Sequence, residues 1–81
     1  MPRRIQVHRL KTEARWFALQ ATGAKRFELR RNDREFWPGD LLLLEEIDEA
    51  GSYTGGHLLR RVTFMLEASD VAGLRPCLLY T

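Results

Sequence analysis

The fold of this chain depends on one stretch, Gly23-Ala24-Lys25-Arg26-Phe27-Glu28-Leu29-Arg30-Arg31-Asn32-Asp33-Arg34-Glu35-Phe36-Trp37-Pro38-Gly39-Asp40. Its eighteen residues hold five cationic side chains, four carboxylates and three aromatic rings. Gly23 can end a preceding helix in the left-handed conformation, and Trp37 to Asp40 predicts a tight turn with proline and glycine at its centre. We therefore expect an extended segment between Gly23 and this turn, and we look for the function there.

A period of two predicts a strand from Ala24 to Arg31. Phe27 and Leu29 share one face, which we expect to lie against the core. The other face is charged and carries Arg26, Glu28 and Arg30. This charged face is compatible with a solvated surface, a ligand-binding site or a catalytic site. The following segment, Asn32 to Phe36, is predicted to be a loop, because Asn32-Asp33 favours a turn.

The residues before this stretch predict a strand followed by a helix. Arg4 to Leu10 alternates apolar and polar residues, as a half-buried strand does. Thr12 can cap a helix, and an apolar stripe predicts that this helix runs from Glu13 to Thr22. We expect Trp16 and Phe17 in the stripe to anchor the helix in the core.

The second half of the chain predicts three further strands. Four leucines open a strand from Leu41 to Ile47 with both faces covered, and Asp48 to Gly56 is predicted to be a hairpin loop. His57 to Leu66 is the longest predicted strand, antiparallel to the previous one. A turn from Glu67 to Gly73 leads to a final strand, Cys77 to Tyr80, that closes the sheet.

Length and composition limit the class of protein. Eighty-one residues suffice for a single domain, residues 1–81, with a modest core. The net charge of +2 is only mildly basic, and a single cysteine excludes an intrachain disulfide. The longest apolar run, Leu41 to Leu44, is too short to span a bilayer, and the N-terminus lacks the apolar core of a signal peptide. We therefore predict a cytoplasmic protein without membrane contact.

The motifs of several enzyme classes are absent from the sequence. It has no metal-ligand spacing, no Gly-x-Ser-x-Gly elbow and no phosphate-binding glycine loop, so we predict neither a metal nor a cofactor. If the protein is an enzyme, Lys25 is the candidate nucleophile and Glu28 the proton carrier. Residues three apart in a strand face opposite sides, so these two can converge only at a bulge or at the strand start near Gly23.

Short motifs along the chain occur in a familiar order. They are His8-Arg9-Leu10-Lys11, Trp16-Phe17, Gly23 to Arg34, Phe36-Trp37-Pro38-Gly39-Asp40, Tyr53-Thr54-Gly55 and Gly73-Leu74-Arg75-Pro76. Together they resemble the bacterial and phage domain family DUF3850, of the ASCH group in the PUA-like superfamily. The resemblance covers nearly the whole chain, and Phe27 to Arg34 is its most specific part. It implies an α+β fold: a small PUA-like β-barrel of five to six mostly antiparallel strands with one main helix.

The resemblance also implies a cleft between the helix and the barrel. The residues expected to line it are His8, Lys11, Lys25, Glu28, Arg30, Asn32 and Arg34. ASCH domains are proposed to bind RNA or nucleotides, so our leading hypothesis is an RNA- or nucleotide-binding module. In this hypothesis the cationic residues neutralise phosphate, while Glu28 and Asn32 read the polar edges of a base.

Two alternative functions stay open. Some relatives in the superfamily are amidohydrolases acting on N4-acetylcytidine, with a Lys-x-x-Thr-x-Arg segment that Lys25 and Arg30 match. Glu28 stands where that segment has threonine, so a hydrolase of N-acylated nucleosides would use Lys25 as nucleophile and Glu28 in proton transfer. The second alternative is a protein–protein adaptor of phage or bacterial origin.

Overall fold

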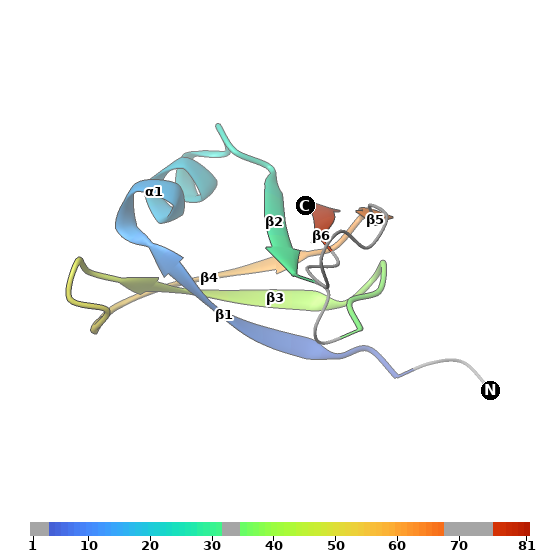
Figure 1. Cartoon of the computed structure of the whole chain (residues 1–81), viewed down its shortest axis with the longest axis horizontal. Helices are drawn as coiled ribbons and strands as arrows, with labels where there is room; N and C mark the ends of the chain where they lie inside the picture. Colours follow the sequence, from blue (N-terminus) through green and yellow to red (C-terminus); the bar gives the residue numbers. More distant parts are fainter. Residues whose placement is uncertain (1–3, 32–34, 68–75) are drawn as a thin grey trace.

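The computed structural model of the chain describes residues 4–31, 35–67 and 76–81. Its elements, in chain order, are β1 (Val7–Glu13), α1 (Ala14–Thr22), β2 (Phe27–Arg31), β3 (Leu41–Ile47), β4 (Tyr53–Arg61), β5 (Phe64–Glu67) and β6 (Pro76–Tyr80) (Figure 1). These six strands and one helix confirm the α+β class.

The described strands form two three-stranded sheets. The first has the order β1-β3-β4, with β1 parallel and β4 antiparallel to β3. The second has the order β2-β6-β5 and is antiparallel throughout. In Figure 1 the first sheet follows the long axis of the molecule, with α1 and the second sheet on the same side of it. The mostly antiparallel pairing agrees with the prediction, but the described residues form two sheets and no closed barrel.

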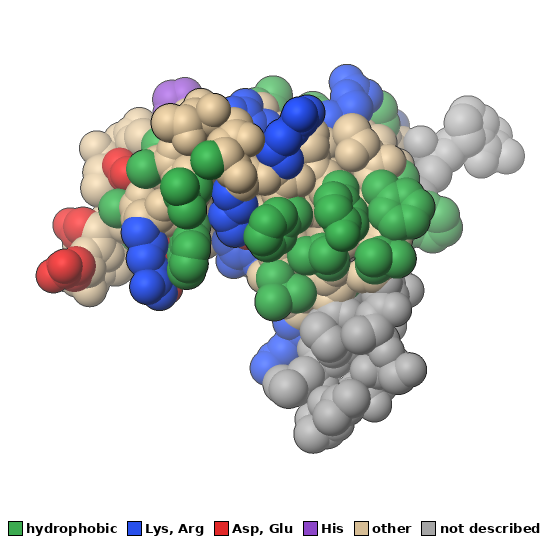
Figure 2. Space-filling view, turned by 90° about the horizontal axis from the view of Figure 1, so that it is seen from above, with side chains coloured by type: hydrophobic (Ala, Val, Ile, Leu, Met, Phe, Trp, Pro, Cys, Tyr) green, Lys and Arg blue, Asp and Glu red, His purple; other side chains and the backbone are tan. Residues whose placement is uncertain are grey.

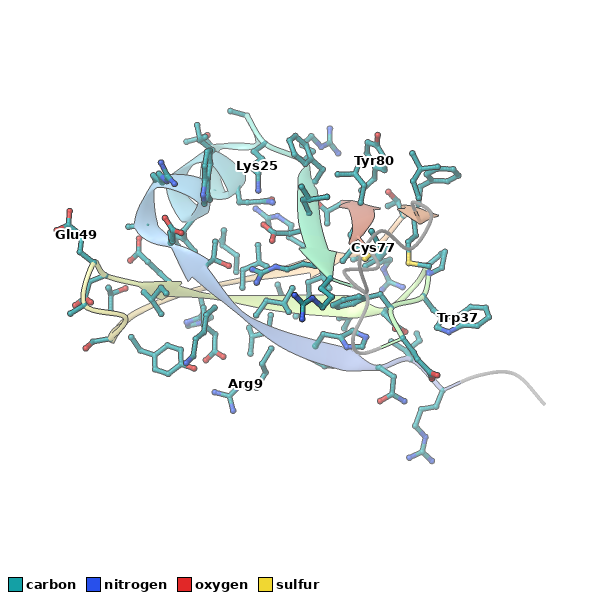
Figure 3. The ribbon with its side chains drawn as sticks, viewed as in Figure 1. Arg9, Lys25, Trp37, Glu49, Cys77 and Tyr80 are labelled. Carbon is teal, nitrogen blue, oxygen red and sulfur yellow. The ribbon has the colours of Figure 1, made fainter. Side chains whose placement is uncertain are left out.

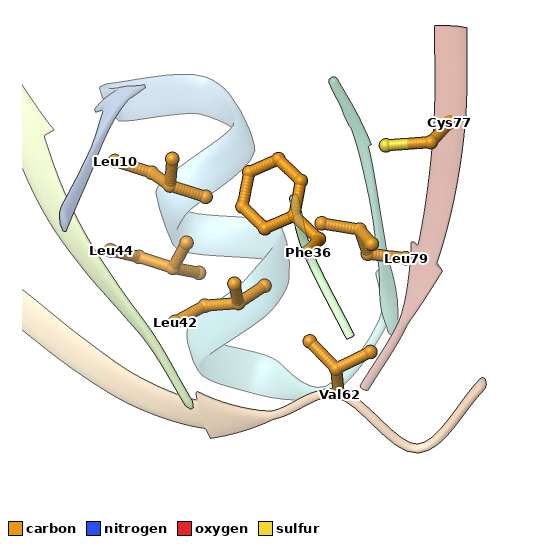
Figure 4. Close-up of a cluster of buried hydrophobic side chains, with 7 residues drawn as sticks. All are labelled: Leu10, Phe36, Leu42, Leu44, Val62, Cys77 and Leu79. Atoms are coloured by element: carbon orange, nitrogen blue, oxygen red, sulfur yellow. The ribbon is translucent and has the colours of Figure 1, made fainter. Parts of the chain in front are cut away.

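The hydrophobic core lies between the two sheets, as the close-up in Figure 4 shows. Its side chains come from both sheets and from the segments next to them: Leu10, Phe36, Leu42, Leu44, Val62, Cys77 and Leu79. The predicted bounds of β3, Leu41–Ile47, are confirmed. Its second and fourth leucines are buried and the other two are half-buried, because β3 is the central strand of its sheet.

The chain enters β3 through the predicted tight turn. The Asp40 N–H donates to the Trp37 carbonyl at 3.0 Å, and Gly39 has φ of 93°, which glycine adopts without steric cost. The Asp40 carboxylate accepts hydrogen bonds from the backbone N–H of Gln6 at 3.1 Å and of Trp37 at 3.2 Å. It also lies 2.8 Å from Nε2 of His8. One buried carboxylate thus holds the turn against β1.

β1 lies further along the chain than predicted, at Val7–Glu13 instead of Arg4 to Leu10. His8, Leu10 and Thr12 are its buried residues. The predicted alternation is therefore right, but the side with the polar residues meets the core. This happens because His8 pairs with Leu42 and Leu10 with Leu44, and these two residues of β3 are fully buried.

The prediction for α1 is wrong at the N-terminal end of the helix and right at the C-terminal end. Thr12 lies in β1, and Glu13 takes the N-cap position without a side-chain capping bond, so the predicted Thr12 cap is wrong. Gly23 ends the helix in the left-handed conformation with φ of 80°, as predicted. Within the described residues, no helix combines the length and apolar character needed to cross a membrane.

α1 buries a polar side chain and leaves its tryptophan near the surface. Gln20 is 1% exposed, whereas Trp16 is 39% exposed. Phe17 is half-buried. The prediction that Trp16 and Phe17 anchor the helix in the core is therefore wrong for Trp16 and only partly met by Phe17. Gln20 is covered by the start of β2, whose Phe27 carbonyl it contacts, whereas Trp16 lines a pocket.

The hairpin between β3 and β4 is shorter than predicted. The Gly51 N–H donates to the Asp48 carbonyl at 2.9 Å, and β4 already begins at Tyr53. The predicted loop from Asp48 to Gly56 is therefore wrong for Tyr53-Thr54-Gly55, which lie in β4, and the pairing of β4 with β3 shifts register between Glu45 and Ile47. Such a bulge lets a glycine sit within a strand.

The segment predicted as one long strand, His57 to Leu66, divides between the two sheets. β4 pairs with β3 and β5 pairs with β6, so the antiparallel pairing with β3 holds only for the first part. Between them, the Val62 N–H donates to the Asp40 carbonyl and the Thr63 N–H to the Tyr80 carbonyl, both at 2.8 Å. The predicted single strand is wrong because the chain changes sheets here without a glycine or proline.

The final strand, β6, closely matches its prediction and lies between β2 and β5. Of the turn predicted from Glu67 to Gly73, only the first residue lies in the described part of the chain. Glu67 ends β5, and the rest of that segment lies outside the described residues.

Candidate functional site

β2 turns two of its charged residues toward the interior. Glu28 pairs with Leu79 of β6, and Arg30 pairs with Cys77. Because paired residues on neighbouring strands share a face, Glu28 and Arg30 lie on the same side as these two core residues. The Glu28 residue is only 4% exposed.

The apolar residues of β2 lie on its outer face. Leu29 is 65% exposed, and Phe27 is also exposed. The prediction that Phe27 and Leu29 face the core is therefore wrong. The period of two is correct, but its phase is set by β6, whose own buried residues fix which side of the sheet meets the core.

Three side chains converge on the Glu28 carboxylate. Its Oε1 accepts hydrogen bonds from Lys25 Nζ at 3.2 Å and from Gln20 Nε2 at 3.1 Å. Its Oε2 accepts a hydrogen bond from Arg30 Nε at 2.9 Å. A buried carboxylate is tolerated when cations and hydrogen bonds compensate its charge, and these three donors do so here.

Lys25 reaches Glu28 because it precedes β2. After the left-handed Gly23, the Lys25 N–H donates to the Leu19 carbonyl at 3.0 Å, which holds this residue against the end of α1. The alternation rule for strands does not apply at this position. The two side chains thus converge at the strand start near Gly23, one of the two places that the sequence analysis allowed.

A second set of hydrogen bonds ties the surrounding elements to this cluster. Gln20 Nε2 also donates to the Phe27 carbonyl at 2.7 Å, which joins α1 to β2. Arg30 Nη2 donates to the Lys11 carbonyl at 2.8 Å, which joins β2 to β1. Arg60 Nη2 donates to the Gln20 carbonyl at 3.1 Å, which joins β4 to α1. Glu28 and Arg30 are therefore each held by hydrogen bonds to more than one part of the chain.

A pocket of about 410 Å³ opens beside this cluster. Its walls come from the end of β1, from α1 and from β2: Lys11, Thr12, Glu13, Trp16, Lys25, Phe27, Glu28, Leu29 and Arg30. Figure 3 shows Lys25 between the helix and β2. Lys25 Nζ lies 5.6 Å from the centre of the Trp16 ring and 5.0 Å from that of Phe27, within the range of cation–π attraction.

Comparison with known proteins identifies the family of the chain. A family model described as "Domain of unknown function (DUF3850)" matches residues 7–75, most of the chain. The chain belongs to the DUF3850 family. The matched range contains every residue that lines the pocket.

A phage protein is similar to this DUF3850 chain. It is the "Uncharacterized 12.9 kDa protein in GpA 3'region" of Escherichia phage P2, which is 37% identical over 65 residues. The similar region covers 80% of this chain and 59% of the phage protein. This chain therefore spans about three-fifths of the length of that relative.

Four of the residues predicted for the site lie around the pocket of this DUF3850 domain. They are Lys11, Lys25, Glu28 and Arg30. The Lys11 ammonium lies 5.8 Å from the centre of the Tyr53 ring. Asn32 and Arg34 lie outside the described residues, so their position relative to the pocket stays a prediction.

His8 lies apart from the residues that line the pocket. Its ring is buried, with Nε2 2.8 Å from Asp40 Oδ2 and its centre 4.6 Å from that of Phe36. Through these contacts His8, a residue of β1, packs against the turn before β3. Trp37 is exposed in that turn and does not line the pocket either.

Two residues that support the site, Gln20 and Arg60, are missing from the predicted set. Gln20 follows Trp16 by four residues and Phe17 by three, so it lies on their side of the helix. A long polar residue within an apolar stripe is a sign of a buried hydrogen-bond donor, and this sign could have identified Gln20. Arg60 lies in a strand with alternating burial, and only the sheet topology brings it to α1.

Proposed function

We propose that this DUF3850 domain is an ASCH-type, PUA-like module that binds RNA, or a nucleotide derived from it, in the pocket beside β2. One observation carries the proposal: a buried carboxylate, Glu28, holds Lys25 and Arg30 at the wall of a pocket that also contains two aromatic rings. The chain order of one helix after the first strand, followed by five more strands, is compatible with the PUA-like assignment.

The cationic groups suit a phosphate. An ammonium has three N–H donors, and the Lys25 group gives one of them to Glu28. Arg30 uses Nε and Nη2 for Glu28 and Lys11, so its remaining guanidinium donors can face a ligand. Anchoring both cations on one carboxylate lowers the entropy lost when they bind an oxyanion.

The aromatic groups suit a base. The rings of Trp16 and Phe27 both lie close to the Lys25 ammonium at the pocket wall, and both are partly exposed. Bases of single-stranded RNA stack on such rings. The volume of about 410 Å³ falls in the range of small-molecule sites, roughly 300–1,000 Å³. In this arrangement Glu28 positions the cations, since both its oxygens already accept hydrogen bonds.

The test is equilibrium binding of AMP and of short single-stranded RNA, measured by calorimetry and fluorescence anisotropy over a range of salt concentrations. We expect affinity to fall with added salt, because phosphate contacts release counterions. Arg30→Ala should weaken binding roughly tenfold or more, the loss typical of a charged hydrogen bond. The matched control is Arg9→Ala, since Arg9 lies on the opposite side of the molecule (Figure 3) and pairs with Glu45. Absence of binding to either ligand at low salt would overturn the proposal.

The Lys25 and Glu28 contact also favours a second candidate, a hydrolase of N-acylated nucleosides. At 3.2 Å, Glu28 is placed to accept the proton that Lys25 must lose before its amine can attack an acyl carbon. Against this, Glu28 would give up its ion pair with Arg30 by taking that proton. Incubation with N4-acetylcytidine separates the two candidates. A hydrolase releases acetate, and Lys25→Arg, which keeps the charge, stops the release but preserves binding.

A further inference from the structure

The outer face of the β2-β6-β5 sheet is apolar. Strand register arranges six of its side chains in two rows of three, an aromatic row of Phe27, Tyr80 and Phe64 and a leucine row of Leu29, Leu78 and Leu66. Phe64 is 55% exposed and Leu66 is 50% exposed. Figure 2 shows hydrophobic side chains gathered over these strands. Contiguous exposed apolar surface on a small soluble domain marks a binding surface.

The aromatic row has a spacing that suits separated bases. The ring centres of Phe64 and Tyr80 lie 6.0 Å apart, with their planes inclined at 56°. Successive bases along one strand of a duplex rise by only about 3.4 Å. Neighbouring rings of this row can each take one base only when the bases are spread apart, which requires a single strand. Base stacking on aromatic side chains accepts any base, because every base has a π face.

The aromatic row begins at the pocket. Phe27 is the first residue of the row and also lines the pocket, where Lys25 Nζ lies 5.0 Å from the centre of its ring. From Phe27 the row crosses β6 at Tyr80 and ends on β5 at Phe64. A strand held by its phosphate at Lys25 could therefore continue over the outer face without a break.

The charge around the outer face also suits nucleic acid. The next outward position of β2 after Leu29 is Arg31, which is exposed. No outward-facing side chain that the structure describes on these three strands is acidic. On the face seen in Figure 2, the acidic side chains lie mainly at the far end of the molecule from the hydrophobic group, and Lys and Arg lie between.

We propose that the outer face of this sheet is a stacking platform for single-stranded nucleic acid that continues from the pocket. The ligand is then an oligonucleotide with one nucleotide in the pocket, where its base meets Phe27, and two further bases on Tyr80 and Phe64. This inference rests on the proposed function, since the pocket supplies the phosphate contacts. It adds that the ligand is a single strand of at least three nucleotides.

The test compares three probes on the full chain: AMP, the single-stranded octanucleotide of adenylate, and the same sequence in an RNA duplex. We expect the octanucleotide to bind at least tenfold more tightly than AMP and more tightly than the duplex. Phe64→Leu removes the ring most distant from the pocket but keeps the surface apolar. It should weaken octanucleotide binding roughly fivefold or more and leave AMP binding unchanged.

Leu66→Ala is the matched control, since Leu66 lies on the same strand and the same face in the leucine row. Stacking predicts little effect of this change on octanucleotide affinity, whereas general apolar contact predicts losses from both variants. Thermal unfolding of each variant checks the fold, and Tyr80→Leu gives a second ring deletion within the row.

Four results would overturn the platform. If the octanucleotide binds no more tightly than AMP, or if Phe64→Leu and Tyr80→Leu leave its affinity unchanged, the pocket stands and the platform does not. If sedimentation shows a dimer that both Phe64→Leu and Leu66→Ala dissociate, the outer face joins two copies of the chain. If neither AMP nor the octanucleotide binds at low salt, the proposed function fails and the platform fails with it.

Discussion

β3 and β2 are both strands of this small domain, but they bury opposite kinds of residue. β3 buries Leu42 and Leu44 completely. β2 buries Glu28, half-buries Arg30 and exposes Phe27. Both strands alternate with a period of two, so the difference lies in which face meets the interior.

The contrast separates stability from function. Burying leucine stabilises the fold directly, by about 25 cal/mol per Å² of apolar surface. Burying an ion cluster stabilises little, because desolvation offsets the attraction between the charges. A strand that places its charges inside and its apolar side chains outside therefore contributes less to the stability of the core than β3 does.

The largest effect is expected from Leu42→Ala in β3. It removes a fully buried side chain and should lower the free energy of unfolding by about 3 kcal/mol. The matched change in β2, Leu29→Ala, should alter it by less than about 0.5 kcal/mol, since Leu29 is on the outer face. Chemical denaturation measures both, and equal losses would contradict the inverted orientation of β2.

Glu28→Ala should have the next largest effect, about 2 kcal/mol. Removal of one partner of a fully buried ion pair costs roughly 3–5 kcal/mol, but Lys25 and Arg30 are partly exposed and solvent screens them. The triple variant Lys25→Met, Glu28→Leu, Arg30→Met should regain most of this stability and still fail to bind nucleotide. A triple variant that stays as unstable as Glu28→Ala would show that the cluster serves the fold.

Gln20→Leu tests the contribution of the hydrogen bonds by which α1 holds β2. The change keeps the size of the side chain but removes its hydrogen bonds to the Phe27 carbonyl and to Glu28. The free energy of unfolding should fall by about 1 kcal/mol, the usual cost of lost buried hydrogen bonds. Thr22→Ala on the exposed end of the same helix is the control. No difference between the two variants would contradict the role of Gln20.

The smallest effect concerns the exposed ion pair of the first sheet, Arg9 and Glu45. The hydrogen bond from Arg9 holds the pKa of the Glu45 carboxyl below its usual value. A lowered folded-state pKa gives stability that is present above the pKa of the unfolded chain and is lost as the pH falls through the folded pKa. Arg9→Ala should slightly reduce the amount of folding stability that is lost as the pH falls through this range. Stability curves of both proteins between neutral and acidic pH, at low salt, check the difference.

The sequence predicts the fold correctly where its pattern is compatible with only one local structure. Four successive leucines fix β3 to the residue, and Gly23 and Gly39 mark the end of α1 and the turn before β3. The pattern does not reveal where the chain changes sheets at Val62 and Thr63, because the alternation continues across this step. That change depends on backbone hydrogen bonds to residues far away in the chain.

The site could be predicted only in part, and for a physical reason. Lys25, Glu28 and Arg30 stood out by charge, and the structure brings all three together. The phase of β2 could not be read from its own residues, because Phe27 and Leu29 look like core residues until the buried Cys77 and Leu79 of β6 are placed beside the opposite face. Gln20 was missed since its role depends on a strand that follows it in the chain.

The bond from Gln20 to the Phe27 carbonyl also covers part of a sheet edge. In the described sheet β2 is an edge strand, and an edge with open backbone groups can template a strand of another molecule. Gln20 occupies one backbone acceptor at the start of this edge, so a strand from another molecule would have to displace it in order to pair there. The same side chain that supports the pocket thus also shields the first part of the edge strand.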